Sequence, residues 1–217
     1  MSRDIFAFSL VEASDGGFAL AGRTSSRERD DYALLVKTDA YGNMVWNQTY
    51  GEGGSYYSAF SLVEISDGGY VVAGCKQSSL GLISEFLLIK TDSNGNMLWN
   101  QTYDGAGYDE TYSLIETSDG GFAVVGNTRL VKSDTNGNLE WSRTYDEGAP
   151  NSLVETSSRG YVLAGDIISS NTGHSDFWLA KTDEYGVIPE FPLWTPLLIM
   201  LVAVAVLGVI YRRKLHN

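Results

Sequence analysis

Two acidic turns in the sequence carry the oxygen donors that a calcium-binding loop would use. Asp92-Ser-Asn-Gly-Asn96 and Asp134-Thr-Asn-Gly-Asn138 alternate carboxylate and amide side chains, as do loops that wrap a hard cation. Neither turn is followed, at the spacing of such loops, by the glutamate that binds the ion through both oxygens. Because Asp and Asn beside Gly are also what a tight turn requires, we interpret both segments as turns and predict no metal ion and no cofactor.

Other residues that could do chemistry are few. His174 and Asp176 could form an acid-base pair, but no nucleophile recurs near them, and a polar loop explains both. Cys75 is the single cysteine, which excludes an internal disulfide, and we expect it to fill a small buried space. The sequence therefore predicts no catalytic site.

The elements that would position any site come from a repeat. Ser61-Leu-Val-Glu-Ile-Ser-Asp-Gly-Gly-Tyr70 has near-copies that begin at Ser9, Ser113 and Ser152. The starts lie 52, 52 and 39 residues apart, a period typical of propellers, solenoids or arrays. Each copy reads as an apolar strand, a glycine turn and a second strand that begins with an aromatic residue, which together predict a repeated β-hairpin.

In the second unit the pattern predicts four strands, at 60–65, 70–73, 86–90 and 97–103. The middle two are apolar on both faces, so each must be covered from two sides, whereas the last alternates as a rim strand does. A four-stranded antiparallel meander repeated in tandem is a β-propeller blade; a helical solenoid would need a period of 3.6, and a parallel β-helix lacks two tight antiparallel turns per unit. We predict an all-β domain over 1–186. Its four blades are expected at about 5–50, 60–103, 112–145 and 151–186.

Two units depart from the pattern. The third lacks the loop between its middle strands, which shortens its third strand to about 129–132, and the fourth has no fourth strand, which leaves 177–180 as an edge. We expect an incomplete, C-shaped ring with a thin third blade and a three-stranded fourth. Further blades upstream of Met1, a second copy of the chain, or an open arc could relieve the exposed ends, and we favour the first.

The charge of the chain is unevenly placed. All 27 acidic residues and 12 of the 15 basic ones precede Phe191, so that part carries a formal charge of −15. An acidic body disfavours nucleic acid, which needs a basic surface. No charged and apolar leader precedes the first strand at Ile5; because a surface destination requires one, we expect the chain to be a fragment or its start to lie upstream of Met1.

The turn before the fourth strand carries a family resemblance. Lys90-Thr-Asp-Ser-Asn-Gly-Asn-Met-Leu-Trp99, with counterparts at 37–46 and 132–141, resembles the strand-turn-strand-tryptophan signature of quinoprotein-like propellers and of tandem repeats in archaeal and bacterial surface proteins. The resemblance implies that Trp46, Trp99 and Trp141 dock between adjacent blades. It carries over no catalytic residues, because none of the acidic, cofactor-binding or paired-cysteine residues of those enzymes can be matched.

The C-terminal segment predicts a membrane anchor. Leu193 to Tyr211 is free of formal charge over nineteen residues, which as a helix would rise about 28 Å and cross a bilayer core. Trp194 and Tyr211 are its interface aromatics, and the basic tail 212–217 predicts a cytoplasmic end with the acidic body outside. A buried core helix is the alternative, which the all-round apolar character and terminal position disfavour.

A linker, 187–192, precedes this span and contains Pro189, Glu190, Phe191 and Pro192. The order of this motif, an apolar helix and a basic tail resembles the PEF-type sorting signal of archaeal surface proteins. The resemblance implies processing by a membrane transpeptidase of the archaeosortase kind, which leaves the protein attached to the cell surface.

Together these features predict a non-enzymatic, membrane-anchored surface module that binds protein or glycan. The turns on one side of the blades are uniform, while the loops on the other side vary in length and chemistry, so we place recognition on the variable side, with Tyr56, Tyr57 and Tyr108 as contacts. The alternative reading of these tyrosines is that they cover blade edges. An exported propeller lyase or hydrolase and a purely structural envelope component are the alternative functions.

Overall fold

The computed structural model describes residues 4–25, 31–78, 84–103, 110–168 and 174–189. The chain divides into two units, Met1–Val187 and Ile188–Asn217, and the fifteen strands of the described residues lie in the first. These are β1 (Asp4–Glu12), β2 (Phe18–Ser25), β3 (Tyr32–Thr38), β4 (Met44–Tyr50), β5 (Ser55–Glu64), β6 (Tyr70–Ser78), β7 (Ser84–Thr91), β8 (Met97–Tyr103), β9 (Ser113–Glu116), β10 (Phe122–Gly126), β11 (Arg129–Ser133), β12 (Leu139–Thr144), β13 (Ala149–Glu155), β14 (Tyr161–Ile168) and β15 (Ser175–Lys181).

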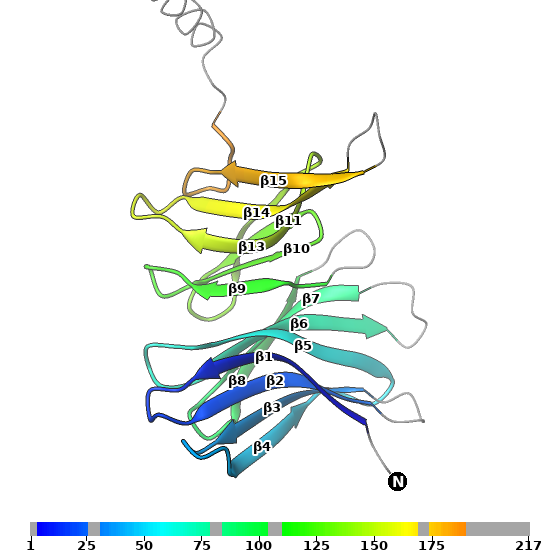
Figure 1. Ribbon diagram of the computed structural model, residues 1–217, viewed down its shortest axis with the longest axis vertical. Helices are drawn as coiled ribbons and strands as arrows, with labels where there is room; N and C mark the ends of the chain where they lie inside the picture. The colour runs from blue at the N-terminus through cyan, green and yellow to red at the C-terminus, as the bar shows by residue number, and fades with distance from the viewer. Residues whose placement is uncertain (1–3, 26–30, 79–83, 104–109, 169–173, 190–217) are drawn as a thin grey trace, which may run out of the picture. The chain divides into compact units, whose positions relative to one another are not determined.

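The strands form four antiparallel meanders in chain order (Figure 1). The first sheet is β1–β4, the second β5–β8, the third β9–β12 and the fourth β13–β15, so three sheets have four strands and the described part of the fourth has three. These sheets confirm the prediction of an all-β body made of antiparallel meanders. The second unit differs in its bounds, because β5 begins at Ser55 and β6 runs to Ser78, both beyond the apolar runs that predicted them.

The third sheet is the small one, as the sequence predicted. Gly126 pairs with Arg129, so Asn127 and Thr128 alone connect β10 to β11. Asn127 has a φ of 48°, a left-handed conformation that asparagine tolerates better than most residues and that tight hairpin turns require.

A β-bulge shapes the first strand of the second sheet. The register shifts between Ala59 and Ser61, and the backbone of Ser58 lies so close to Gly74 on β6 that a side chain at Gly74 would overlap the Ser58 carbonyl oxygen. The first and fourth sheets carry the same register shift opposite Gly22 and Gly165. Glycine is therefore needed at this position for close backbone approach.

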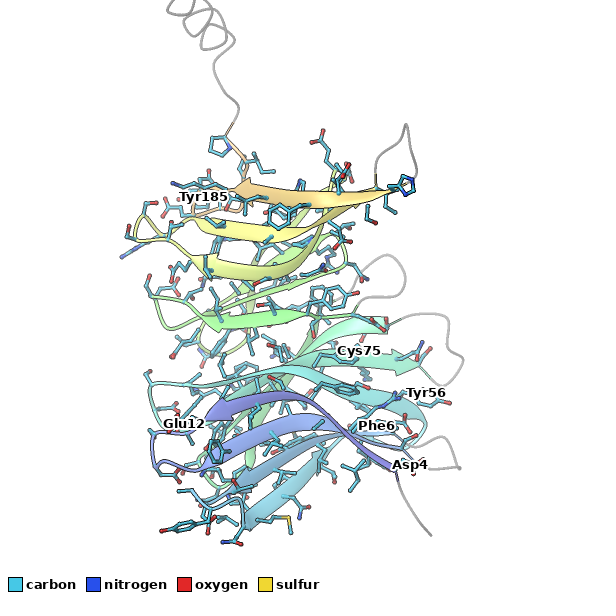
Figure 2. All side chains as sticks on the ribbon, in the orientation of Figure 1. Asp4, Phe6, Glu12, Tyr56, Cys75 and Tyr185 are labelled. Carbon is cyan, nitrogen blue, oxygen red and sulfur yellow. The ribbon has the colours of Figure 1, made fainter. Side chains whose placement is uncertain are left out.

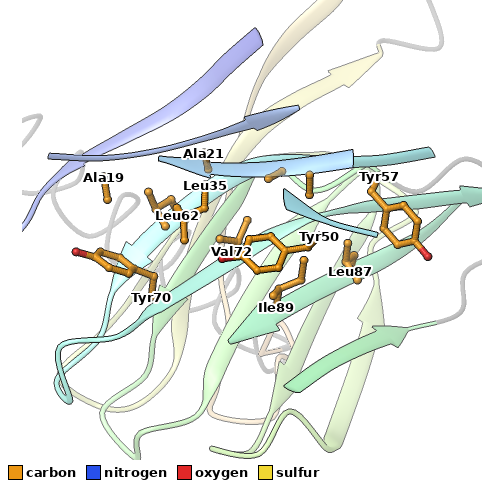
Figure 3. Close-up of a cluster of buried hydrophobic side chains, with 12 residues drawn as sticks. Ala19, Ala21, Leu35, Tyr50, Tyr57, Leu62, Tyr70, Val72, Leu87 and Ile89 are labelled. Carbon is orange, nitrogen blue, oxygen red and sulfur yellow. The ribbon is translucent and has the colours of Figure 1, made fainter. Parts of the chain in front are cut away.

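Hydrophobic side chains fill the spaces between consecutive sheets. One cluster joins the first and second sheets and contains Leu35, Tyr50, Tyr57, Leu62 and Tyr70 (Figure 3). A second cluster joins the second and third sheets, and a third joins the third and fourth. The core is therefore a series of layers between sheets, because the middle strands are apolar on both faces.

Aromatic residues in or just after β4, β8 and β12 reach across to the next sheet. The rings of Trp46, Trp99 and Trp141 lie 6.1, 6.0 and 5.8 Å from those of Tyr70, Phe122 and Tyr161, measured between centroids, in that order. The three tryptophans are half-buried, packed against the clusters between the sheets. The hydroxyl groups of Tyr50, Tyr103 and Tyr145 donate hydrogen bonds of 2.7, 2.7 and 2.8 Å to the carbonyl oxygens of Gly95, Gly137 and Gly186.

A serine-glutamate pair links each sheet to the next. The backbone N–H and the hydroxyl of Ser14 both donate to the carboxylate of Glu64, at 2.7 and 2.9 Å. Ser66 makes the same two bonds to Glu116, and Ser118 makes them to Glu155. The repeated Ser-Asp-Gly-Gly turns therefore join neighbouring sheets as well as reversing the chain.

The aspartate of that turn neutralises a lysine of the third strand. Lys132 is buried, and its ammonium group lies 3.0 Å from Asp119. Partial burial of Asp119 raises its pKa, but the hydrogen bonds from Thr117 and Gly121 and the charge of Lys132 outweigh this and lower the pKa to about 2. Lys37 with Asp15 and Lys90 with Asp67 repeat the pair.

This pair predicts a loss of stability in acid. Because the pKa of Asp119 is lowered on folding, its contribution is complete above the unfolded pKa of about 4 and is lost as the pH falls toward 2. The carboxylate is half-exposed, so solvent screening limits the contribution to about 1 kcal/mol. Urea unfolding of the full-length protein at pH 6 and pH 2.5 should show a drop that is smaller in Asp119→Asn, by most of this amount. An equal drop in both proteins would contradict the assignment.

No helix in the described ranges, 4–189 with their gaps, is long and apolar enough to cross a membrane. The predicted span at 193–211, the basic tail, and Glu190, Phe191 and Pro192 of the sorting motif lie outside the described residues.

Candidate functional site

The predicted recognition side is described only in part. The variable loops are 23–31, 76–85 and 166–176, and their central residues, 26–30, 79–83 and 169–173, lie outside the described residues, as does Tyr108. Tyr56 and Tyr57 belong to β5 rather than to a loop, and Figure 2 shows Tyr56 at the opposite end of the strands from Glu12 and Tyr185. Tyr56 is half-buried, whereas Tyr57 is 6% exposed and packs in the first cluster, so Tyr57 has little surface to offer a ligand.

The opposite side, where the uniform turns lie, contains a groove between the third and fourth sheets. Its volume is about 470 Å³, within the range of about 300 to 1,000 Å³ typical of ligand sites. The residues that line it come from β11, β12, β13, β14 and the turns beside them. They are Asp119, Lys132, Glu140, Trp141, Glu155, Arg159, Tyr161, Glu184 and Tyr185. We call this site the Arg159 groove.

Four of these residues depart from the repeat. Glu140 stands where the first and second sheets have Val45 and Leu98. The other two grooves carry glycine in place of Arg159, Ser93 or Thr135 in place of Glu184, and Asn94 or Asn136 in place of Tyr185. Each substitution adds charge or an aromatic ring. Compared with the two equivalent grooves, this one therefore gains two carboxylates, a guanidinium and an aromatic ring.

Arg159 occupies a conformation that disfavours arginine. Its φ is 64°, in the left-handed region, where the first three turns have Gly16, Gly68 and Gly120 with φ of 80°, 81° and 81°. A residue with a Cβ in this region costs about 1 to 2 kcal/mol relative to right-handed geometry. Backbone strain of this kind clusters at functional sites, where the side chain it presents has a use.

The charges of the groove are only partly matched. Lys132 pairs with both Asp119 and Glu140, the latter at 2.9 Å, and Glu155 accepts the two bonds from Ser118. No such partner is found, among the described residues, for the side chains of Arg159 and Glu184, which are exposed. The groove therefore offers one guanidinium donor and one carboxylate acceptor beside an aromatic wall.

That wall consists of Trp141, Tyr161 and Tyr185. Tyr161 is buried beneath Trp141, and burial, together with the carboxylates of Glu155, Asp119 and Glu140, raises its pKa, so its hydroxyl stays neutral. Tyr185 is 57% exposed at the mouth of the groove. Aromatic faces with a few polar groups around them can bind a small polar molecule by stacking and hydrogen bonding.

The acidic turns that resembled calcium loops use their oxygens locally. One oxygen of Asp92 accepts from the backbone N–H groups of Asn94 and Asn96, and the other accepts from the Asn96 side chain, which lowers the pKa of Asp92. Asp134 makes the same bonds. No three His, Cys, Asp or Glu side chains of the described residues are placed to hold a metal ion.

The remaining chemistry-bearing residues lie apart from the groove. His174 and Asp176 are exposed beside and within β15. Cys75 is partly buried, and burial raises the pKa of its thiol to about 12, which keeps it in the unreactive protonated form.

Comparison with solved structures finds chains that align over most of this one. A protein of unknown function from Bacteroides caccae aligns over 84% of this chain and 62% of its own, with a TM-score of 0.53 and 12% identity. The WD40 domain of Neurospora crassa Pan2 aligns over 83% of this chain and 57% of its own, with a TM-score of 0.49 and 12% identity. The WD40 β-propeller domain of Doa1 aligns over 87% and 72%, with a TM-score of 0.46 and 9% identity.

No protein-family model matches the sequence, and no curated protein does. The chain spans less than two thirds of the length of the first two solved structures. The described part of its body is all-β and consists of antiparallel sheets in series.

Proposed function

We propose that this chain is a non-enzymatic binding module of the cell surface, held in the membrane by residues 193–211, and that the Arg159 groove binds a neutral oligosaccharide. The observation that carries the proposal is the gathering of four departures from the repeat around one groove. This moves the expected recognition from the variable loops to the turn side. The loops remain available for additional contacts.

The chemistry of the groove favours a sugar over the other candidates. A sugar hydroxyl both donates and accepts, so it can bridge the guanidinium of Arg159 and the carboxylate of Glu184, while the ring packs on Tyr185. Four carboxylates against two cations disfavour an acidic polysaccharide. The cationic side chains of a basic peptide offer no acceptor to Arg159, whereas a sugar hydroxyl does. A neutral saccharide meets neither obstacle.

Binding should depend on the residues that depart from the repeat. Arg159→Gly and Tyr185→Ala are each expected to weaken binding of neutral oligosaccharides, displayed on an array with acidic sugars and basic peptides, by at least about tenfold, because each removes about 1.4 kcal/mol or more. Tyr41→Ala is the matched control: Tyr41 occupies the same turn position in the first unit, is 92% exposed, and lies outside the groove. The proposal would be contradicted if Tyr41→Ala weakened oligosaccharide binding as much as the groove variants do, or if the natural protein bound only the basic peptides on the array.

The same arginine should weaken the fold. Arg159→Gly is expected to raise the free energy of unfolding by about 1 kcal/mol, because glycine adopts this left-handed conformation at no steric cost. The reciprocal change Gly120→Arg should lower it by a similar amount. Urea unfolding of the full-length proteins measures both. A less stable Arg159→Gly protein would show that the arginine contributes to packing and not to binding alone.

Anchoring has a separate test. Two arginines placed at Ala203 and Val206 would each cost about 2.5 to 3.5 kcal/mol at the centre of a membrane helix. We expect the natural chain to stay with the membrane pellet after carbonate washing and the double variant to be released. Release of both proteins, or of neither, would contradict a spanning helix here.

A further inference from the structure

The first and fourth sheets each carry one member of a serine-glutamate pair whose other member is absent from the described part of its own chain's neighbouring sheets. The pairs Ser14–Glu64, Ser66–Glu116 and Ser118–Glu155 join consecutive sheets. The repeat leaves two positions over: Glu12 on the first sheet is the counterpart of these glutamates, and Ser157 on the fourth sheet is the counterpart of these serines. Both are exposed, and neither the Glu12 carboxylate nor the Ser157 hydroxyl has a hydrogen-bond partner in the described part of the chain.

The outer face of the first sheet carries apolar side chains at the positions that, in the second sheet, pack against a neighbouring sheet. Leu10 is 61% exposed, whereas its counterpart Leu62 is 3% exposed against the first sheet. Ile5 is 67% exposed, and its counterpart Tyr57 is buried in the same cluster. The Gly42 carbonyl oxygen, counterpart of the acceptors at Gly95, Gly137 and Gly186, also belongs to this end.

The outer face of the fourth sheet likewise carries apolar side chains at the positions that, in the second sheet, pack against the third sheet. Phe177 is 79% and Leu179 62% exposed, whereas their counterparts Phe86 and Leu88 are buried against the third sheet. Val154 extends the same apolar surface. Exposed apolar surface of this kind on an edge sheet favours association.

In place of the upstream blades favoured from the sequence, we propose that a second copy of this chain covers these faces, because the two ends match each other. The fourth sheet of one copy would pack on the first sheet of the other, with Ser157 paired with Glu12. Three internal interfaces show how such faces fit. The contact is heterologous, because it joins two different surfaces, so two copies can satisfy both ends only by closing into a ring. Two copies supply eight sheets, within the range of about four to eight blades found in closed propellers.

The contact between copies should be weaker than the internal ones. Each internal interface uses a tryptophan from a fourth strand and a tyrosine at or just after the end of that strand, and the described part of the fourth sheet has no fourth strand. Association should therefore be reversible and depend on concentration. The proposal is independent of the Arg159 groove, which lies between the third and fourth sheets of one copy.

Disulfide trapping between two tagged full-length proteins in detergent tests the contact. In a Cys75→Ser background, Glu12→Cys on one protein and Ser157→Cys on the other should form a covalent heterodimer on mild oxidation, whereas each alone should not. Ser66→Cys with Glu116→Cys in a single chain is the positive control for the geometry. The double variant Glu12→Cys, Ser157→Cys should link copies; a link within one chain would show that the chain closes on itself and would overturn the proposal.

Charge at either face should disrupt association. Sedimentation of the full-length protein should give dimers. Leu10→Glu and Leu179→Glu should each raise the dissociation constant of the dimer at least about tenfold. A mixture of the two variants should again associate, because one intact face of each remains. Leu98→Glu, on an exposed residue of β8, is the control and should leave the dimer intact. A natural protein that is monomeric at all concentrations would overturn the proposal.

Discussion

Replacing Gly74 by alanine should cost about 4 kcal/mol of unfolding free energy, which is at the upper end of single-residue effects. The added Cβ would overlap the carbonyl oxygen of Ser58, and that oxygen is backbone held by the pairing of β5 with β6. Because backbone atoms cannot rotate away as a side chain can, the bulge must deform and the adjoining ladder must shift. The affected strands carry much of the cluster between the first two sheets.

Urea unfolding followed by circular dichroism measures this effect. Gly53→Ala is the matched control, because nothing lies within 4 Å of the position of its added Cβ and its φ is not in the left-handed region. We expect the control to differ from the natural protein by less than about 0.5 kcal/mol. A Gly74→Ala protein as stable as the control would mean that the close approach of the two strands is wrong.

Replacing Trp99 by alanine should cost about 3 kcal/mol, the low end for a buried large aromatic, because this indole is half-buried. The ring packs on Phe122 of the third sheet and against Gly137, where an added Cβ would meet its edge. Its loss leaves a gap between the second and third sheets that the rigid turn cannot fill.

The neighbour Leu98 provides the control for Trp99. Leu98 lies on the same strand and is 58% exposed, so Leu98→Ala should change the free energy of unfolding by less than about 0.5 kcal/mol. Circular dichroism is the appropriate measurement, since removal of an indole alters fluorescence directly. Equal effects at the two positions would show that Trp99 does not connect the sheets.

The sequence was sufficient to predict the repeat, because each turn has its own chemistry. Gly68 and Gly95 lie at left-handed positions, with φ of 81° and 79°, in the two turns that flank the middle strands of the second unit, and those strands follow the apolar pattern. The pattern missed the first five residues of β5. There Ser55, Tyr56 and Tyr57 extend the strand because they pair with β6, a tertiary contact that a local pattern does not contain.

The candidate groove could not be predicted in the same way. Its residues are spread along the chain from Asp119 to Tyr185 in two consecutive sheets, and Arg159 and Tyr185 read as ordinary turn residues when each is taken alone. A signal was nevertheless present: Ser157-Ser158-Arg159-Gly160 breaks the Ser-Asp-Gly-Gly pattern of the other three turns. Tyr57, chosen as a contact because aromatic residues near loops often bind ligands, instead packs inward, since its side chain lies on the face toward the first sheet.

The repeated links between sheets bear on how such a chain can change its length. Each sheet presents a serine, a tryptophan and a tyrosine to the next and receives them with a glutamate, an aromatic ring and a glycine carbonyl. A gene duplication or deletion that adds or removes one whole unit would therefore create a junction with the same contacts as the junctions it replaced. The second unit could be lost or copied without inventing a new interface, whereas a cut within a sheet would separate a donor from its acceptor. Recombination at the connections between sheets is thus the change that this architecture tolerates best.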